Sequence, residues 1–395
     1  NDGGSTITAL TLDMSDAGRM LSTSGLNITG GNTGQVVLTS GNAAWDATID
    51  FDTTGTNEHW RVGVEGSDGT FYVGNIDQGG GAAISIHPTT KDVSVVSLNG
   101  IPFYSDVANN SMYTHDVSGT DSTAQGNTAY GFNALDAVTG GDLNTVVGYL
   151  AGSAINSGSN NVLMGYATGD ALTTGSDNVA IGYAALSVED TGSKNVAVGK
   201  SALNALNYNG DGYNVAVGYN AGLLVTTGIQ NTIIGGLAGD SLMTGDNNVA
   251  LGYAAFSAAN TNESGNVAIG SSALSALDNG TTAYTYNTAI GYNAGAAVTS
   301  GIENTLVGGE AGKETTIGNY NTALGLFSLH SNKDGDHNTA IGYKALEDYD
   351  DGDGNGNNTA VGSKSQFNAT TGEFNTSLGS LSMGLGVTTG DYNVA

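Results

Sequence analysis

The sequence contains no cysteine, only 2 prolines and only 9 lysine and arginine residues. Without cysteine, no disulfide can staple the fold and no thiolate site exists. The 37 Asp and Glu residues leave a net charge of −28, which argues against nucleic-acid binding because that function needs a basic surface. The same charge argues against an anionic membrane surface and favours solubility outside the cell.

Long hydrophobic runs are also missing, and none approaches the ~20 residues that a membrane-spanning helix needs. We therefore expect no membrane insertion. The sequence begins with Asn1 rather than Met and has no basic leader, so we expect any targeting segment to lie outside it.

Glycine, in contrast, is abundant at 63 residues. Collagen requires glycine at every third position and much proline, so this composition excludes it. Disorder is disfavoured because hydrophobic residues make up 39% of the chain, and Val, Ile and Leu recur with a fixed period.

That period comes from one phrase, N-[TV]-x-x-x-G, which recurs through the second two-thirds of the chain. Ten of the fifteen spacings between its asparagines are seventeen residues, and the other five are 18 to 21. A fixed period at this scale is typical of a solenoid. The sixteen asparagines are Asn127, Asn144, Asn161, Asn178, Asn195, Asn214, Asn231, Asn248, Asn266, Asn287, Asn304, Asn321, Asn338, Asn358, Asn375 and Asn393.

Each position of the phrase has a physical interpretation. The residue after Asn is always Thr or Val, which favour strands. The unvarying glycine at the fourth position predicts a corner with a positive φ angle or a close backbone approach. The asparagines should form an inward or corner ladder of hydrogen bonds between coils. The predicted structural ladder comprises Asn127, Asn144, Asn161, Asn178, Asn195, Asn231, Asn287 and Asn304, with Gly131, Gly148, Gly182 and Gly291.

Seventeen residues are too few for a helix-pair repeat but fit one β-coil of two short strands and two turns. The predicted fold is all-β, a parallel β-roll or β-solenoid whose coils stack at ~4.8 Å into a rod about 70–80 Å long. Longer spacings place their extra residues late in the coil, so the variable loops at 204–213, 258–265, 276–286 and 346–357 should protrude on one side.

The strand phrase is apolar on both faces. In NVAIGYAAL, Ala180 points one way while Val179 and Ile181 point the other. A strand that is apolar on both faces is covered on both faces, and a thin coil can cover only its inner one. We therefore expect further copies of the chain to cover the other face, in a homo-oligomer that fold analogy makes three-fold.

The fifth position after Asn holds Tyr in seven copies and Phe132 in one. A tyrosine stripe can serve as a surface on which sugars stack. It can equally be a packing ladder between coils or between chains, because tyrosines stack well in register.

Residues 1–105 lack the repeat. They predict a small β-rich domain that is intertwined as in a fibre shaft, and the segments AISIHP and DVSVVSL are expected to be strands. Residues 106–126 form a transition segment. Residues 127–395 hold the sixteen repeats.

No catalytic, cofactor or metal site stands out. The five histidines show no metal-ligand spacing and are expected on the surface. Asp351 to Gly356 match the opening of a calcium loop, but Gly362 occupies the position of the bidentate glutamate, which favours a solvated acidic loop. No nucleophile elbow, P-loop or dinucleotide fingerprint is present.

The phrases NTAIGYNAG, NVAIGYAAL and NVAVGKSAL resemble the head repeats of trimeric autotransporter adhesins. They are still more similar to the seventeen-residue form of that repeat in phage tail fibres. In the first part of the chain, ALTLDMSDAGRM and HWRVGVEGSDGTFYVG resemble tail-fibre shaft segments. The resemblance implies a left-handed trimeric β-roll and an intertwined shaft. The sequence shows neither an autotransporter stalk nor a membrane anchor, which favours a phage fibre.

The leading hypothesis is a non-catalytic, extracellular tail-fibre shaft that projects receptor contacts from a virion. Its partners would be two further copies of itself, other virion tail proteins and a glycan or protein of the host surface. The alternatives are a glycan-degrading tailspike depolymerase with paired carboxylates, and a self-polymerising extracellular filament.

Overall fold

The computed structural model describes nine short strands between residues 47 and 113. It further describes residues 123–395 except 260–261, 281–283, 351, 353–354 and 387–388. The chain divides into two compact units, Asn1–Val95 and Val96–Ala395. The predicted boundary at residue 105 therefore falls inside the second unit.

The first unit contains one antiparallel sheet in the order β1-β2-β3-β4-β5. Its strands follow one another in the chain, and the ladder between β2 and β3 pairs Trp60 with Asn75 and Val64 with Phe71. Strands β4 and β5 lie in the two segments that the sequence predicts to be strands. The segment 9–20 and the turn at 65–70 lie outside the described residues. The bounds are β1 Ala47–Asp52, β2 His59–Val64, β3 Phe71–Asn75, β4 Ile84–Ile86 and β5 Val93–Val95.

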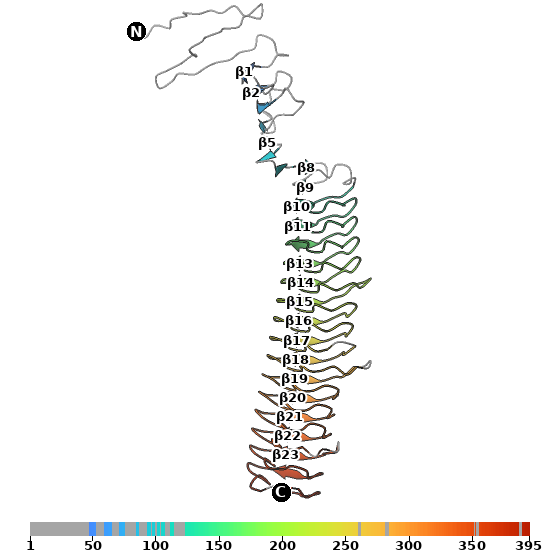
Figure 1. The fold of residues 1–395 in the computed structure, drawn as a ribbon, viewed down its shortest axis with the longest axis vertical. Helices are drawn as coiled ribbons and strands as arrows, with labels where there is room; N and C mark the ends of the chain where they lie inside the picture. Colours follow the sequence, from blue (N-terminus) through green and yellow to red (C-terminus); the bar gives the residue numbers. More distant parts are fainter. Residues whose placement is uncertain are drawn as a thin grey trace, which may run out of the picture. The chain divides into compact units, whose positions relative to one another are not determined.

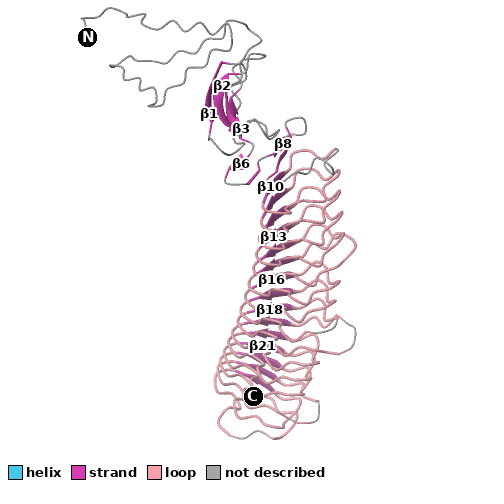
Figure 2. Cartoon of the chain, turned by 45° about the horizontal axis from the view of Figure 1, so that its top comes forward, coloured by secondary structure: helices cyan, strands magenta, loops and turns pink. Residues whose placement is uncertain are grey.

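The second unit is a parallel β-solenoid of about 15 turns with seventeen-residue coils, and no described residue of the chain is helical. Figures 1 and 2 show its strands stacked one above another along one side. Two short hairpin pairs precede them, β6 with β7 and β8 with β9, and β9 then pairs in parallel with β10. Because β9 covers the edge of β10, the first coil does not present an open strand edge.

All strands from β10 to β24 are three residues long and pair in parallel without a register shift, so that Ala180 faces Ala197 and Ala197 faces Ala216. Longer coils leave this register unchanged. The bounds are β6 Ser97–Leu98, β7 Ile101–Pro102, β8 Tyr104–Asp106, β9 Ser111–Tyr113, β10 Thr128–Tyr130, β11 Thr145–Val147, β12 Val162–Met164, β13 Val179–Ile181, β14 Val196–Val198, β15 Val215–Val217, β16 Thr232–Ile234, β17 Val249–Leu251, β18 Val267–Ile269, β19 Thr288–Ile290, β20 Thr305–Val307, β21 Thr322–Leu324, β22 Thr339–Ile341, β23 Thr359–Val361 and β24 Thr376–Leu378.

Each coil contains one strand, and the prediction of two strands per coil is wrong. After the corner glycine, the backbone enters left-handed conformations, as at Ala184 (φ 50°) and Leu186 (φ 54°). These residues still join the stack, because the Ala184 amide donates to the Tyr166 carbonyl of the coil before, and the Leu186 amide donates to the Ala202 carbonyl of the coil after. The turn thus satisfies its polar groups between coils without being extended.

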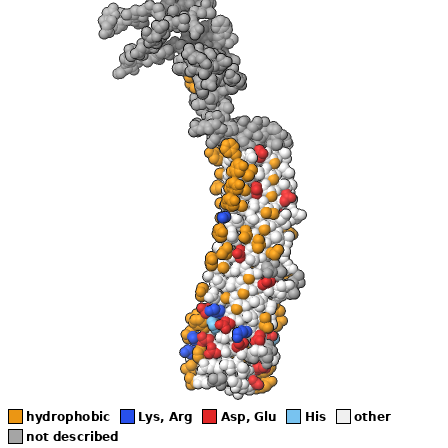
Figure 3. Space-filling model, in the orientation of Figure 1, with side chains coloured by type: hydrophobic (Ala, Val, Ile, Leu, Met, Phe, Trp, Pro, Cys, Tyr) orange, Lys and Arg blue, Asp and Glu red, His pale blue; other side chains and the backbone are white. Residues whose placement is uncertain are grey.

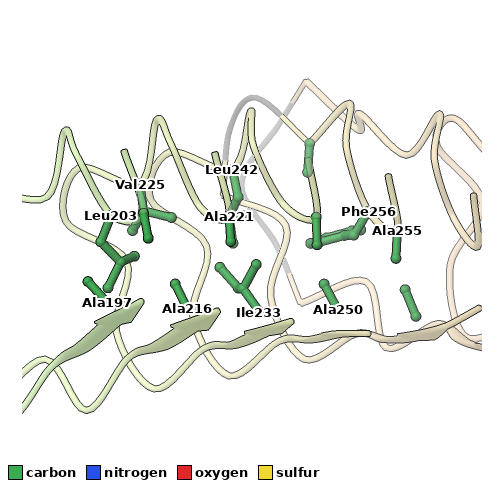
Figure 4. Packing of buried hydrophobic residues seen from close by; sticks show 14 of the residues in the cluster. Ala197, Leu203, Ala216, Ala221, Val225, Ile233, Leu242, Ala250, Ala255 and Phe256 are labelled. Carbon is green, nitrogen blue, oxygen red and sulfur yellow. The ribbon is translucent and has the colours of Figure 1, made fainter. Parts of the chain in front are cut away.

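At two neighbouring interior positions, most coils share one large side chain. It comes either from the centre of the strand or from the eighth position after Asn, while the other site holds Ala or Gly. Leu163 lies in a coil with Gly169, whereas Ala180 lies in a coil with Leu186, and all four are buried. The coil with Ala216 and Gly222 has no large residue at either position. It is filled from the coils before and after it, because a Cβ atom at Gly222 would lie 3.0 Å from Leu203 and 3.1 Å from Ile233 (Figure 4).

The longer coils place their extra residues away from the strands. In Figure 1, the loops near β14, β19 and β23 protrude on the side opposite the strand stack. Of the four predicted variable loops, only 204–213 is described at every residue.

Candidate functional site: ladders, outward strand face and anchored loop

The repeat asparagines from Asn127 to Asn375 lie buried inside the solenoid, and each links its coil to the next. The Oδ1 atom of Asn127 accepts a hydrogen bond from the backbone amide of Asn144 at 2.9 Å, and its Nδ2 donates to the Gly141 carbonyl of its own coil at 2.8 Å. The amide-to-Oδ1 bond recurs at all fifteen steps from Asn127 to Asn393, at 2.8–3.2 Å. The eight asparagines of the predicted ladder are all fully buried.

The ladder changes only where the coil is longer. In the coils of Asn195 and Asn266, Nδ2 donates to the carbonyl of Ser193 or Ser264, because no glycine carbonyl lies at the usual place. In the coil of Asn338, Nδ2 has no partner among the described residues. The amide-to-Oδ1 step persists in all three coils, so the insertions leave the contact between coils intact.

The corner glycines combine a positive φ angle with a close backbone approach. Gly131, Gly148, Gly182 and Gly291 have φ of 141°, 136°, 133° and 144°. A Cβ atom at any of them would lie 2.1–2.4 Å from the carbonyl oxygen of the corner glycine in the next coil. No side chain fits there, which explains why the position never varies.

A second ladder, which was not predicted from the sequence, runs two residues before the asparagines and is formed at nine of the fifteen steps. The backbone amide of Ser159 donates to Ser176 Oγ at 3.0 Å, and the amide of Ile229 donates to Asp246 Oδ1 at 2.8 Å. Here the acceptor lies in the following coil, so this ladder runs opposite to the asparagine ladder. The signal was available, because Ser, Asp or Asn stands at this position in most copies.

The outward face of the strands is apolar and partly exposed. In β13, Ala180 is fully buried while Val179 and Ile181 remain partly exposed, as the alternation predicted. Met164, Leu251 and Leu324 at the third position are 47%, 41% and 48% exposed. Figure 3 shows hydrophobic side chains gathered along this edge of the solenoid.

The tyrosines of the fifth position extend this face. The Tyr166 ring lies between Tyr149 and Tyr183, with ring centroids 5.7 and 5.1 Å away. Its two faces are therefore occupied by neighbouring rings, which supports a packing ladder over a surface for stacked sugars. Lys200 continues the row, with Nζ 5.7 Å from the ring centre of Tyr183 and 5.6 Å from that of Tyr219.

Loop 204–213 is held by a buried carboxylate. Glu189 occupies an inward position where most coils have Val, Ile or Leu, and its side chain is inaccessible to solvent. Its carboxylate accepts hydrogen bonds from the amides of Gly192 at 2.8 Å, Asp190 at 3.1 Å and Tyr208 at 3.3 Å. Burial raises the pKa of Glu189, and these hydrogen bonds oppose the rise.

The other titratable groups with raised pKa values or close partners are spread along the solenoid. Burial also raises the pKa of Asp170 and Asp240, but these lie in coils far apart along the stack. His330 Nε2 lies 3.3 Å from Glu310, and the His337 ring stacks on Tyr320 at 4.8 Å. His87, His115 and half of the segment 351–356 lie outside the described residues.

Within the part of the chain that the structure describes, no group of three potential ligands is placed to hold a metal ion. The described residues also include no helix of the length and hydrophobicity required to cross a membrane. Comparisons of the chain with protein-family models, with curated proteins and with solved structures found no match.

Proposed function

We propose that this chain is a segment of a homotrimeric, non-catalytic virion tail fibre that carries contacts to a host surface. The observation that carries the proposal is the outward strand face. Its third strand position holds an aliphatic residue, Met or Tyr in all fifteen coils and its first position holds Val or Thr, while the opposite side bears the inserted loops. One side of the rod is suited to association and the other to presentation.

Further copies of the chain are the partner that this face fits. Its apolar groups recur once per coil at the strand spacing of about 4.8 Å, so a partner must match that period along the whole rod. A second and a third copy of the chain have the same period because they have the same sequence. A buried apolar interface of this length is typical of permanent assemblies rather than of transient encounters.

The assignment to a virion rests on the resemblance of NTAIGYNAG and NVAVGKSAL to tail-fibre repeats. The net charge of −28 fits an extracellular protein that must avoid non-specific association. Contacts with other tail proteins and with a host glycan or protein belong to the same proposal.

Analytical ultracentrifugation tests the association. The parent chain should sediment with three times the mass of one chain at every concentration. The double variant Met164→Lys/Leu324→Lys puts charges on the strand face and should dissociate at low concentration, because a buried unpaired ammonium is costly. The control Leu224→Lys/Met243→Lys changes residues that are 45% and 40% exposed but lie off the strands, and it should remain trimeric.

Two outcomes would contradict the proposal. A parent chain that stays monomeric would show that the strand face needs no partner, and a mass that rises without limit would indicate a filament. Incubation with host polysaccharide tests the non-catalytic role, since shortened glycan chains would establish a depolymerase instead.

A further inference from the structure

Loop 204–213 presents a row of polar and aromatic side chains to solvent. Asn207, Asn209, Asp211 and Tyr213 are exposed, while the residues between and beside them are buried or partly buried. The alternation holds although the backbone is not a regular strand: the Gly210 amide donates to the Tyr208 carbonyl at 2.8 Å, and Tyr213 has a φ angle of 51°. The loop protrudes near β14 on the side away from the strands, so it stays accessible when the strand face is covered (Figure 1).

The backbone of the loop is fixed to the coil before it. The Ser193 amide donates to the Gly210 carbonyl, and the Gly212 amide donates to the Ser193 carbonyl, both at 2.9 Å. Glu189 holds the Tyr208 amide from inside, and the Tyr208 ring packs against the hydrophobic core. A surface row held in this way loses little conformational freedom when it binds a ligand.

The exposed side chains are also oriented by contacts with that coil. Thr191 Oγ1 donates to Asn209 Oδ1 at 2.7 Å. Lys194 Nζ donates to Asp211 Oδ2 at 2.6 Å and to the Tyr213 hydroxyl at 3.2 Å, and lies 5.2 Å from the Tyr213 ring centre. The hydrogen bond with Asp211 raises the pKa of Lys194, so both groups are charged at neutral pH and cancel each other.

The chemistry of the row fits a polyhydroxylated ligand. Amide groups can donate to and accept from hydroxyl groups, the carboxylate accepts from them, and tyrosine adds a rigid amphipathic surface at little entropic cost. An anionic ligand would find no uncompensated cation in this row, and the net charge of the chain would repel it. We propose that loop 204–213, with Lys194, is a binding site for a neutral glycan; this inference rests on the proposed host-contact function and names its ligand class.

The site includes a positioning residue that does not face the ligand. Glu189 lies beneath the loop and holds the Tyr208 amide, so its loss would loosen the row without removing a contact group. Glutamine at this position keeps one acceptor oxygen for the loop amides, whereas alanine keeps none.

Binding of the full-length chain to mannan, dextran and galactan tests the inference, with heparin and polysialic acid as anionic probes. We expect binding to at least one neutral polysaccharide, and a loss of affinity of about tenfold or more in Tyr213→Ala and in Asn209→Ala, as for a lost contact of about 1.4 kcal/mol. The control Tyr253→Ala removes a tyrosine that is 61% exposed but lies at the fifth position of another coil, outside loop 204–213, and it should bind like the parent.

Glu189→Ala should also weaken binding, and Glu189→Gln should restore it, with the sedimenting mass unchanged in both. The inference is overturned if the parent binds only the anionic probes, or if Tyr213→Ala and Asn209→Ala bind like the parent. Attachment to host cells distinguishes the two proposals. A chain that attaches to cells but binds no neutral polysaccharide retains the proposed function, whereas one that attaches to no cell loses both.

Discussion

At the residue scale, asparagine is the one side chain that fits the start of each coil. It must accept a hydrogen bond from the coil after it and donate one within its own coil, as Asn231 does toward the Asn248 amide at 3.0 Å and the Gly245 carbonyl at 2.8 Å. Aspartate has the same shape but cannot donate when ionised, and serine is too short to span both partners. The two functions together explain why no other residue occupies this position.

Asn231→Asp tests the donor. The ionised carboxylate would be buried, would leave the Gly245 carbonyl without its partner and would face that oxygen, at a cost of about 3 kcal/mol or more in unfolding free energy. Burial would raise the folded-state pKa of the new carboxyl above its unfolded value. The destabilisation should therefore be small below pH 4, where the acid is protonated in both states, and should grow as pH rises through the folded pKa.

Denaturant titrations at pH 4 and pH 7 measure this difference. The control is Asn247→Asp, at the last residue of the same coil and outside the ladder, where Asn247 is exposed. It should change stability by about 0.5 kcal/mol or less at either pH. Equal effects on stability at the two positions would show that the hydrogen bond donated by the buried side-chain amide does not stabilise the fold.

At the scale of the element, the coil is defined by a fixed interior volume rather than by a fixed sequence. The large residue stands at either of two positions, and the glycine opposite provides the space. A Cβ atom at Gly169 (φ 55°) would lie 3.1 Å from Leu163 Cδ2. Leucine itself tolerates this backbone conformation, as Leu186 (φ 54°) demonstrates at the same position of the next coil. Steric exclusion by Leu163, in addition to the φ angle, therefore accounts for Gly169.

A double-mutant cycle on this pair tests the exchange. Leu163→Ala should leave a cavity and cost about 2–5 kcal/mol, and Gly169→Leu should overpack the coil and cost about 1–3 kcal/mol. The combined variant recreates the arrangement of Ala180 and Leu186 and should be more stable than the sum of the single changes predicts. Additive losses in chemical denaturation would contradict the idea of one shared volume.

At the scale of the whole molecule, each coil contacts only its neighbours, so the solenoid is modular. Every ladder step joins chemically equivalent atoms, and the strand register passes unchanged through coils of 17 to 21 residues. Stability is then a sum of coil and interface contributions, and the rod should tolerate a change in the number of coils.

Removal of residues 161–177, which joins Asn160 to Asn178, deletes one complete coil. The Asn178 amide would then meet Asn144 Oδ1, and the coil of Ala180 and Leu186 would again follow a coil with glycine at the eighth position. We expect a folded solenoid whose calorimetric unfolding enthalpy falls by roughly 12 kcal/mol per chain, at about 0.7 kcal/mol per residue. Removal of residues 161–168 alone breaks both ladders and should abolish cooperative unfolding. Similar losses in the two variants would argue against modularity.

Sequence alone was sufficient to predict the coil and its period, because the same physical requirement recurs at each copy. Asn and Gly are each the single residue type that satisfies their position, so the phrase N-[TV]-x-x-x-G is visible without any structure. The alternation around Ala180 similarly indicated which side of the strand is buried. The resemblance to tail-fibre repeats added the proposals of a trimer and of a virion, which the structure of one chain leaves as proposals.

Only the tertiary structure revealed how the rest of the coil is built. Residues such as Ala184 and Leu186 adopt left-handed conformations that their side chains disfavour locally, and they do so because their amides find carbonyls in adjacent coils. Likewise, nothing in the sequence distinguishes Glu189 among the 37 Asp and Glu residues. Its role is visible only in the structure, where the coil buries it beneath loop 204–213. Both depend on atoms sixteen or more residues away, which local sequence patterns do not encode.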